Sequence, residues 1–198
     1  MGKVRVFVSL QQRTVWAILV CLWSSVAMAA IDAGKPTKIH PEFKPIKMIL
    51  AQSEDQIDLA RSRFIIERFL DSSVNVDTSL KAIDQIAAEI KAVPRYNDTV
   101  EGKLNGIVQY LYLSGEWNKK QPYHYDFDDP LGTAKPENSR LSNYLKTKTG
   151  NCVSMPMLVL VLGERLGLDM SLSTAPLHLF VRLKDEGHDY NFEATAGG

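Results

Sequence analysis

The chain is organised around KTGNCVSMP, residues 148–156, in which a turn marked by Gly150 leads into a long apolar run. Pro156 follows Cys152 by four residues and lacks the amide that would bond the Cys152 carbonyl, so a helix starts just after the cysteine or is kinked there. Residues 155–166 are apolar nearly all round and end at Gly167, which predicts a central buried helix. Either start leaves Cys152 at the positive end of that helix.

The hydrophobic period changes from helical to strand-like after Gly167. Residues 170–173 fit a strand, residues 177–183 alternate between apolar and polar, and residues 190–195 fit a returning strand. A two- or four-residue loop centred on Glu186-Gly187 would pair Phe180 with Glu193, making His178 and Glu193 diagonal neighbours about 7–8 Å apart at the backbone. A three-residue loop would turn Glu193 to the opposite face.

Cys152, His178 and Glu193 follow one another in the order nucleophile, base and orienting carboxylate. A helix N-terminus and a nearby imidazole lower the pKa of a thiol, and the amides of Cys152 and of the first helical turn are natural donors to an oxyanion. The alternative for Cys152 alone is a small buried hydrophobe, and His178 alone fits an ordinary core or surface histidine. A metal site with His188 matches no compact ligand pattern, so we expect no metal and no cofactor.

The N-terminus has the pattern of an export signal. Residues 1–30 hold three of the 23 basic residues and no acid, and an uncharged run over residues 14–31 contains the small-x-small sequence Ala27-Met28-Ala29. We therefore predict a signal peptide over residues 1–29 and a periplasmic or extracellular protein. The alternative is a retained membrane anchor at residues 14–31, since that run is close to the ~20 residues that a spanning helix needs. Cleavage would remove Cys21 and leave Cys152 as the single thiol.

The rest of the chain predicts a short lead-in and one α+β domain. Proline-containing residues 30–53 are expected to be an extended linker, and residues 54–198 to be the domain. Its first part, residues 54–115, contains three helical patterns: residues 54–70, whose charged side chains are expected to face solvent, residues 79–93, and a helix opened by an Asp98-x-x-Glu101 capping box and ended near Gly115. A loop over residues 116–140 and a core over residues 141–198, starting with a short helix at 141–146, complete the domain.

The loop at residues 116–140 is polar, aromatic and long enough to be functional. We expect Trp117, Tyr123 and Tyr125 to form a substrate rim or lid, with Asn151 as a further substrate-binding residue. Its acidic run could be taken for a calcium loop, but the glycine in sixth place and the closing glutamate are missing.

Composition limits the partners. The 198 residues are 45% apolar and 23% charged with zero formal net charge, which suits a globular domain and argues against nucleic acid as a partner. A membrane would be a partner only through a retained anchor.

Three segments also resemble the transglutaminase-like superfamily: Gly-Asn-Cys at residues 150–152, His-Leu-Phe-Val-Arg at 178–182 and Asn-Phe-Glu-Ala-Thr at 191–195. The likeness is greatest to the bacterial branch in which a helical N-terminal segment precedes the papain-like core. It implies a cysteine helix packed on an antiparallel sheet, with Cys152 as nucleophile, His178 as base and Glu193 in the carboxylate position. It also implies further strands after Gly198, so that the sheet here would be C-terminally truncated.

These observations predict an exported thiol enzyme of acyl transfer, acting on a protein or peptide substrate through a Cys-His-Glu triad. Hydrolysis is favoured over cross-linking because water is always present. The alternative is a non-catalytic binding or envelope-assembly module that keeps the fold and uses the loop after Trp117 to bind a partner.

Overall fold

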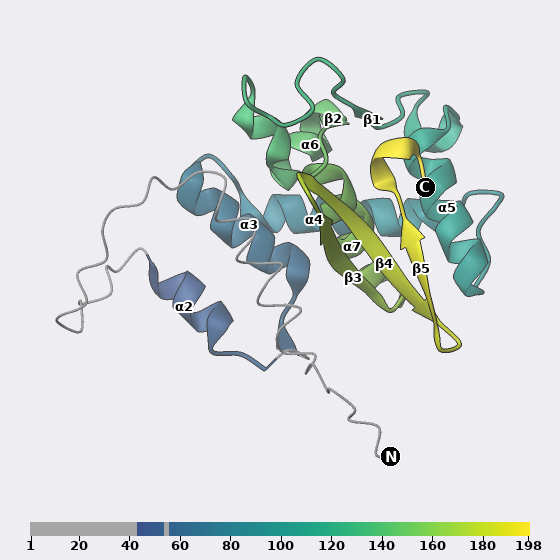
Figure 1. Cartoon of the computed structure of the whole chain (residues 1–198), viewed down its shortest axis with the longest axis horizontal. Helices are drawn as coiled ribbons and strands as arrows, with labels where there is room; N and C mark the ends of the chain where they lie inside the picture. The colour runs from purple at the N-terminus through teal and green to yellow at the C-terminus, as the bar shows by residue number, and fades with distance from the viewer. Residues whose placement is uncertain (1–42, 54–55) are drawn as a thin grey trace. The chain divides into compact units, whose positions relative to one another are not determined.

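The computed structural model describes residues 43–53 and 56–198 (Figure 1). The chain divides into two compact units, residues 1–58 and residues 59–198. The predicted signal peptide, and Cys21 within it, lies outside the described residues. In the parts of the chain that are described, no helix is both long and apolar enough to cross a bilayer.

The first unit contains α2 (Lys44–Leu50), which corrects the prediction that residues 30–53 are extended throughout. Pro45 stands in the first turn of this helix. At that position a missing amide costs no hydrogen bond, and the fixed φ of proline suits a helix. A proline spaced among lysines therefore opens a helix here.

The second unit begins with three helices: α3 (Leu59–Leu70), α4 (Val76–Ile90) and α5 (Val100–Tyr112). α3 starts five residues later than predicted. α4 starts three residues earlier, because the side chain of Asn75 accepts from the Thr78 amide and caps it. The cap of α5 is Thr99, whose hydroxyl accepts from Gly102 N at 3.0 Å, and not the predicted Asp98, which accepts from the Tyr96 hydroxyl instead.

The polar face of α3 is not simply solvated, as the sequence had suggested. Glu67 is only 1% exposed and Arg63 is buried with it, joined by a 2.6 Å ion pair from Arg63 Nε to Glu67 Oε1. The same carboxylate accepts from the amides of Leu141 and Ser142 at 2.6 and 2.9 Å. α3 thus supplies the N-terminal cap of α6 (Leu141–Thr147), whose own N-cap residue provides no side-chain bond.

Helix α7 (Ser154–Arg165) lies at the centre of the second unit, with every residue from Ser154 to Gly163 buried. It begins just after Cys152, which is one of the two arrangements that Pro156 allows. It ends in a Schellman motif, in which Leu168 N bonds the Gly163 carbonyl and Gly167, with φ of 71°, bonds the Glu164 carbonyl. The predicted central helix and its glycine terminator are confirmed.

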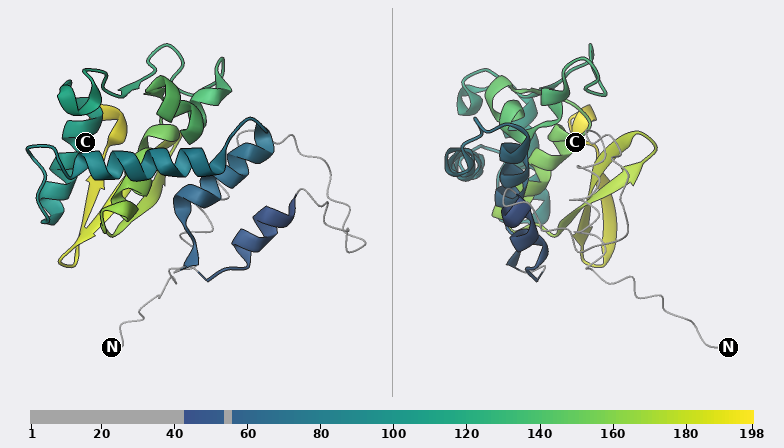
Figure 2. Two further views of the ribbon diagram at one scale, coloured as in Figure 1. Left: turned by 180° about the vertical axis from the view of Figure 1, so that it is seen from behind. Right: turned by 90° about the vertical axis from the view of Figure 1, so that its left-hand side faces the viewer.

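A three-stranded antiparallel sheet in the order β3 (Met170–Ala175), β4 (His178–Asp185), β5 (His188–Phe192) packs on α7. Helices α4 and α7 lie on one side of it (Figure 2). Leu179, Val181 and Leu183 of β4 are buried while the residues between them are half-exposed, which confirms the predicted alternation from residue 178 onward. Leu177, predicted on the same face, instead lies in the turn before β4 and is 83% exposed. Asp185 pairs with His188, so the hairpin turns on Glu186-Gly187 alone.

That register pairs Val181 with Phe192, which puts Phe180 opposite Glu193 as the two-residue loop predicted. β5 itself stops at Phe192, before the predicted end at Thr195, and a 3-10 turn over Ala194–Ala196 follows. A second, two-stranded parallel sheet pairs β1 (His124–Tyr125) with β2 (Thr149–Gly150), so it ties the 116–140 loop to the segment that carries Cys152.

Candidate active site

Cys152 stands in a tight turn between β2 and α7 that is built on Asn151. Asn151 is fully buried, and its side-chain oxygen accepts from the amides of Val153 and Ser154 at 3.0 and 3.3 Å. In return, the hydroxyl oxygen of Ser154 accepts a hydrogen bond from the Asn151 amide at 3.1 Å. Gly150 is required before this turn, because a Cβ there would lie 2.5 Å from the Ser154 hydroxyl. The sequence Gly-Asn-Cys is therefore a local device for presenting the cysteine.

The same turn is anchored from outside by the segment that precedes α6. The Ser139 hydroxyl accepts from Asn151 Nδ2 at 2.8 Å, and the Ser139 carbonyl accepts from Arg63 Nη2 at 2.7 Å. Ser154 donates to the Asn138 carbonyl at 2.6 Å. A continuous chain of hydrogen bonds thus runs from α3 through Ser139 to the cysteine turn.

The amides of the first turn of α7 are largely occupied, contrary to the expectation that they are free to bind an oxyanion. The side-chain oxygen of Asn151 accepts hydrogen bonds from the amides of Val153 and Ser154, and its backbone carbonyl accepts one from the amide of Met155. The amide of Cys152 is the exception. Within the described part of the chain it bonds no carbonyl and no other side chain, and it is directed at the thiol of Cys152 itself.

The thiol of Cys152 is 6% exposed and lies between two backbone carbonyls. Its sulfur is 3.8 Å from the Pro130 oxygen, in the 116–140 loop, and 3.9 Å from the Leu177 oxygen, in the turn before β4. Burial raises the pKa of this thiol; its own amide lowers it, and the charge of Glu193 raises it again. The net direction is upward, which corrects the expectation that the helix N-terminus lowers it, and the resting sulfur is therefore a protonated thiol.

His178 and Glu193 are brought together as the register predicted. His178 Nε2 lies 2.7 Å from Glu193 Oε2, so within the described part of the chain Nδ1 is the ring nitrogen left without a hydrogen bond. Leu177, whose carbonyl contacts Cys152, directly precedes His178. The imidazole is thus oriented on one nitrogen and available on the other, and the backbone carbonyl just before it contacts the thiol.

Thr195 holds the Glu193 carboxylate and was not among the residues expected in the site. Its hydroxyl and amide donate to Oε1 at 2.7 and 3.1 Å, leaving Oε2 for His178. Although desolvation raises the pKa of Glu193, the hydrogen bonds from Thr195 and His178 lower it below its ordinary value. Glu193 is therefore an anion at neutral pH. The sequence signal for Thr195 was its place two residues after the carboxylate, where a hydroxyl can close a local turn.

Tyr112 also lies close to this carboxylate and was not foreseen. Burial raises the pKa of its hydroxyl, and the charge of Glu193 raises it further. The hydroxyls of Tyr112 and Tyr144 are buried and bond no group of the described chain. Both read in the sequence as ordinary helix residues, so no local pattern marked them.

Of the four residues expected to bind substrate, Tyr125 is the one placed beside the thiol. Its hydroxyl shares the Pro130 carbonyl, at 3.4 Å, with Cys152. Desolvation is the main cause that raises the pKa of Tyr125, and the negative charges at Cys152, Glu193 and Asp126 would raise it further. Its ring packs edge-on against Phe127 at 5.0 Å between centroids.

The other three residues have structural contacts. Trp117 donates from its indole to the Gln109 carbonyl at 3.0 Å and so closes the end of α5. Tyr123 packs edge-on against Tyr144, and burial together with the charge of Glu89 raises its pKa to about 12. Asn151 forms the cysteine turn described above. The substrate-binding role given to these residues stays a prediction.

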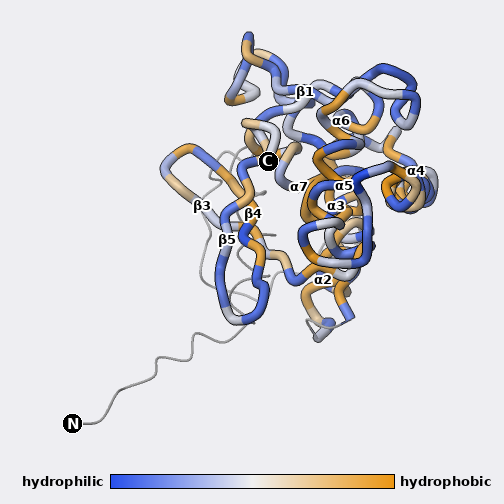
Figure 3. The backbone as a smooth tube through the Cα atoms, turned by 90° about the vertical axis from the view of Figure 1, so that its right-hand side faces the viewer, coloured by the Kyte–Doolittle hydropathy of each residue, from blue (hydrophilic) through white to orange (hydrophobic). Residues whose placement is uncertain are grey.

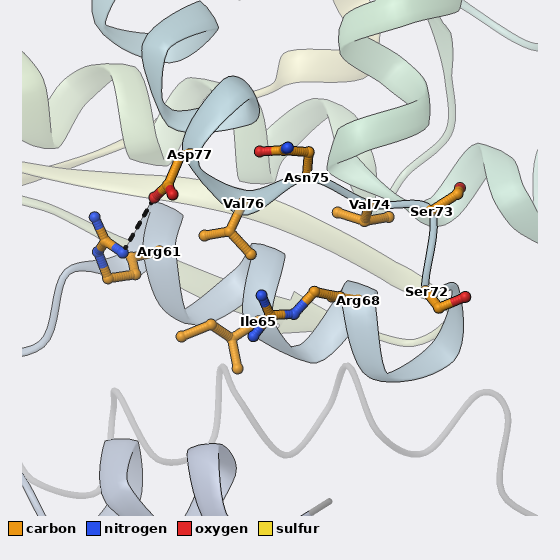
Figure 4. A pocket seen from close by; sticks show the side chains of 9 residues that line it. All are labelled: Arg61, Ile65, Arg68, Ser72, Ser73, Val74, Asn75, Val76 and Asp77. Carbon is orange, nitrogen blue, oxygen red and sulfur yellow. Dashed lines mark ion pairs between the residues drawn. The ribbon is translucent and has the colours of Figure 1, made fainter.

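A cavity of about 470 Å³ lies between α3 and the start of α4 and includes none of these residues (Figure 4). Arg61 and Arg68 of α3 face residues 72–77 across it, and Arg61 is paired with Asp77 at 3.7 Å. This cavity is separate from the candidate active site. Among the described residues, no three His, Cys, Asp or Glu side chains gather closely enough to hold a metal ion.

The chain belongs to the transglutaminase-like superfamily. A family model for the transglutaminase-like superfamily matches residues 77–198, which begin in the first turn of α4. The matched range includes Cys152, His178 and Glu193. The α+β architecture of a cysteine-bearing helix on an antiparallel sheet, expected from the sequence, is confirmed with it. Comparisons with curated proteins and with solved structures gave no match.

Proposed function

We propose that this protein is an exported thiol-dependent acyl-transfer enzyme that acts on amide or peptide bonds. Cys152 is the nucleophile, His178 the general base and Glu193 the residue that orients the imidazole. The observation that carries the proposal is the 2.7 Å hydrogen bond between His178 and Glu193, made by a histidine whose preceding carbonyl lies 3.9 Å from the Cys152 sulfur. Membership of a superfamily with a papain-like core supports the same assignment.

The protonated state of the thiol determines how the reaction starts. Because burial raises the pKa of Cys152, the sulfur attacks the substrate carbonyl as it gives its proton to His178 Nδ1, and not as a preformed thiolate. The carbonyl oxygen becomes an oxyanion that the Cys152 amide can bind, and Glu193 stabilises the imidazolium. The imidazolium then gives its proton to the leaving amine, the carbon–nitrogen bond breaks, and a thioester remains on Cys152.

Water completes the cycle in a hydrolase, and an amine completes it in a cross-linking enzyme. In hydrolysis, His178 takes a proton from water as the oxygen attacks the thioester, and Cys152 leaves with that proton. We propose hydrolysis, since water is always present at a solvent-accessible site. The uncharged run at residues 14–31 supports export, through a cleaved signal over residues 1–29.

The thioester itself is the most direct readout. Purified protein is incubated with a series of p-nitrophenyl acyl esters, and the acyl adduct on Cys152 is followed by intact-mass spectrometry. We expect the adduct to be absent in Cys152→Ala and to form about 10²–10⁴-fold more slowly in His178→Ala, the usual contribution of a general base. His188→Ala, which removes an exposed histidine at the start of β5, is the matched control and should react like wild type. Decay of the adduct with and without an added primary amine separates hydrolysis from amine transfer.

The alternative of a non-catalytic binding module predicts a different result. In that case Cys152 acylates no faster than an ordinary buried thiol, and His178→Ala changes nothing. Equal rates in wild type and His178→Ala would end the catalytic proposal.

A further inference from the structure

In the 116–140 loop, charged side chains are buried and large apolar side chains are exposed, the reverse of the usual arrangement. Asp126 and Asp129 are buried, whereas Phe127 is 81% and Leu131 is 54% exposed. A buried carboxylate and an exposed large apolar side chain are each informative departures from the normal distribution. Four such departures within six residues indicate that this part of the loop is built to present apolar groups outward.

The buried carboxylates fix that presentation. Asp129 accepts from the amides of Thr133, Ala134 and Lys135 at 2.8, 3.0 and 2.6 Å, and these bonds lower its pKa despite the raising effect of desolvation. Asp126 accepts from Asn138 Nδ2 at 2.7 Å. The loop is therefore anchored from within, and the outward position of Phe127 and Leu131 follows from its hydrogen bonds.

An apolar residue projects in the same way from the tip of the β3–β4 hairpin. Leu177 is 83% exposed, and with Phe127 it is one of the two most exposed large hydrophobic side chains among the described residues. It also has φ of 59°, in the left-handed region that favours glycine or asparagine. The hairpin tip is coloured hydrophobic in Figure 3, in contrast to the polar turn at the other end of β4. A leucine kept in a strained and solvent-exposed position points to a function for its side chain.

The backbones of the two segments that carry these apolar side chains meet at Cys152. The sulfur lies 3.8 Å from the carbonyl of Pro130, which precedes Leu131, and 3.9 Å from the carbonyl of Leu177 itself. Tyr125, which packs on Phe127, bonds the same Pro130 carbonyl. The backbones of both segments therefore border the thiol, and each segment carries exposed apolar side chains close in sequence to that border.

We propose that Leu177, Phe127 and Leu131 form an apolar subsite that selects acyl donors with a bulky aliphatic or aromatic side chain next to the reacting carbonyl. This inference rests on the proposed function, since it names the substrate class of the same site. The three residues determine specificity and take no part in proton transfer. Asp128, exposed beside Phe127, adds a negative charge that disfavours acidic side chains at this position.

The test uses three chloromethyl ketones, acetyl-Leu, acetyl-Ala and acetyl-Asp, on the purified full chain. The second-order rate of Cys152 alkylation is measured for each and compared with that of iodoacetamide, which has no side chain. We expect the leucine probe to react about tenfold faster than the alanine probe, the lower end of what an apolar pocket supplies, and the aspartate probe to be slowest.

Three variants assign the preference to the subsite. Leu177→Asn places a residue that tolerates the left-handed turn, and Phe127→Ser changes the other segment, so each should lower the leucine-to-alanine ratio to about two or three. The ratio compares two probes on the same variant, so a change in the reactivity of the thiol itself, which the iodoacetamide rate measures, does not enter it. Tyr190→Ser removes another exposed apolar side chain, from the middle of β5, and should keep the full ratio.

The subsite proposal is overturned if the leucine-to-alanine ratio is near one in wild type, or if both Leu177→Asn and Phe127→Ser leave that ratio intact. This outcome is distinguishable from failure of the catalytic proposal, which shows in the iodoacetamide rate. If His178→Ala slows iodoacetamide but the leucine-to-alanine ratio is flat, the enzyme stands and the subsite falls. If His178→Ala has no effect but the ratio is high and lost in Leu177→Asn, the apolar subsite stands and the catalytic proposal falls.

Discussion

Replacement of Glu67 tests how the helical part of the domain supports the cysteine. Its carboxylate is 1% exposed and accepts three hydrogen bonds: from Arg63 Nε, and from the amides of Leu141 and Ser142 at the start of α6. α6 has seven residues and no capping side chain of its own. So short a helix depends on contacts from outside, and α6 leads through Lys148 directly into the segment that carries Cys152.

The expected cost follows from the three bonds. Each hydrogen bond to a charged group contributes about 1.5–3 kcal/mol, but the three share one carboxylate and are not additive. Removing one partner of a buried ion pair costs about 3–5 kcal/mol, which already includes part of the same loss. We therefore expect Glu67→Ala to lower the free energy of unfolding by about 4 kcal/mol, a large share of the about 5–15 kcal/mol of a typical domain. Glu67→Gln keeps the shape and one acceptor oxygen but offers an NH₂ group to a donor, so we expect about 2–3 kcal/mol.

Urea denaturation of the full chain, followed by circular dichroism, measures both values. Glu116→Ala is the matched control, since Glu116 forms an exposed i,i+4 ion pair with Lys120 at 2.9 Å; its loss should change stability by less than about 0.5 kcal/mol. A second measurement, the rate of Cys152 alkylation in native buffer, should rise in Glu67→Ala as α6 loosens. If Glu67→Ala costs no more than Glu116→Ala, the buried cap does not stabilise α6 and the proposed support of the cysteine turn is wrong.

Three further changes have expected outcomes of their own. Glu193→Gln removes a charge that raises the pKa of Cys152, so the pH midpoint of iodoacetamide alkylation should move downward while acyl transfer slows. Burial is the larger cause of the raised pKa and is unchanged, so the midpoint should stay above that of an ordinary thiol. An upward move would contradict this reasoning. Leu177→Gly relieves a left-handed backbone at an 83% exposed position and should stabilise the chain by about 0.5–1 kcal/mol in urea denaturation, while the preference for the leucine probe is lost. Asn151→Ala removes the acceptor of two helix amides and should cost about 2 kcal/mol by the same assay, with Ser79→Ala, half-buried on α4, as a mild control.

The parts of the site that follow from local rules were predictable from the sequence. A two-residue turn and a period of two residues fix which face each strand residue occupies, so the His178–Glu193 neighbourhood could be read from the spacing around Glu186-Gly187. Pro156 limited where α7 can start, and Gly167 marked its end. In each case the deciding contact lies within a few residues of the pattern that predicts it.

The anchoring of the site was not predictable, because its partners are distant in sequence. Glu67 looks like any charged residue on an amphipathic helix, and only the approach of α6, 74 residues later, makes it a buried cap. Asp126 and Asp129 look like solvated acids or metal ligands until the loop closes around them. The pKa of Cys152 was misjudged for a related reason: a helix N-terminus is visible in the sequence, whereas the burial that raises this pKa arises only in the folded chain.

The resting state of the thiol links the apolar subsite to the start of the reaction. Two carbonyl oxygens lie within reach of the single Cys152 S–H, and a hydrogen bond from the protonated thiol to either of them opposes ionisation. In the proposed mechanism the sulfur must therefore leave these carbonyls and turn toward His178 Nδ1 before it can attack. A bulky side chain held between Leu177 and the Phe127–Leu131 segment would bear on the two segments that provide those carbonyls. Under this scheme the apolar group both places the reacting carbonyl and disturbs the contacts that keep the thiol protonated, so that activation of Cys152 is coupled to arrival of the preferred acyl donor.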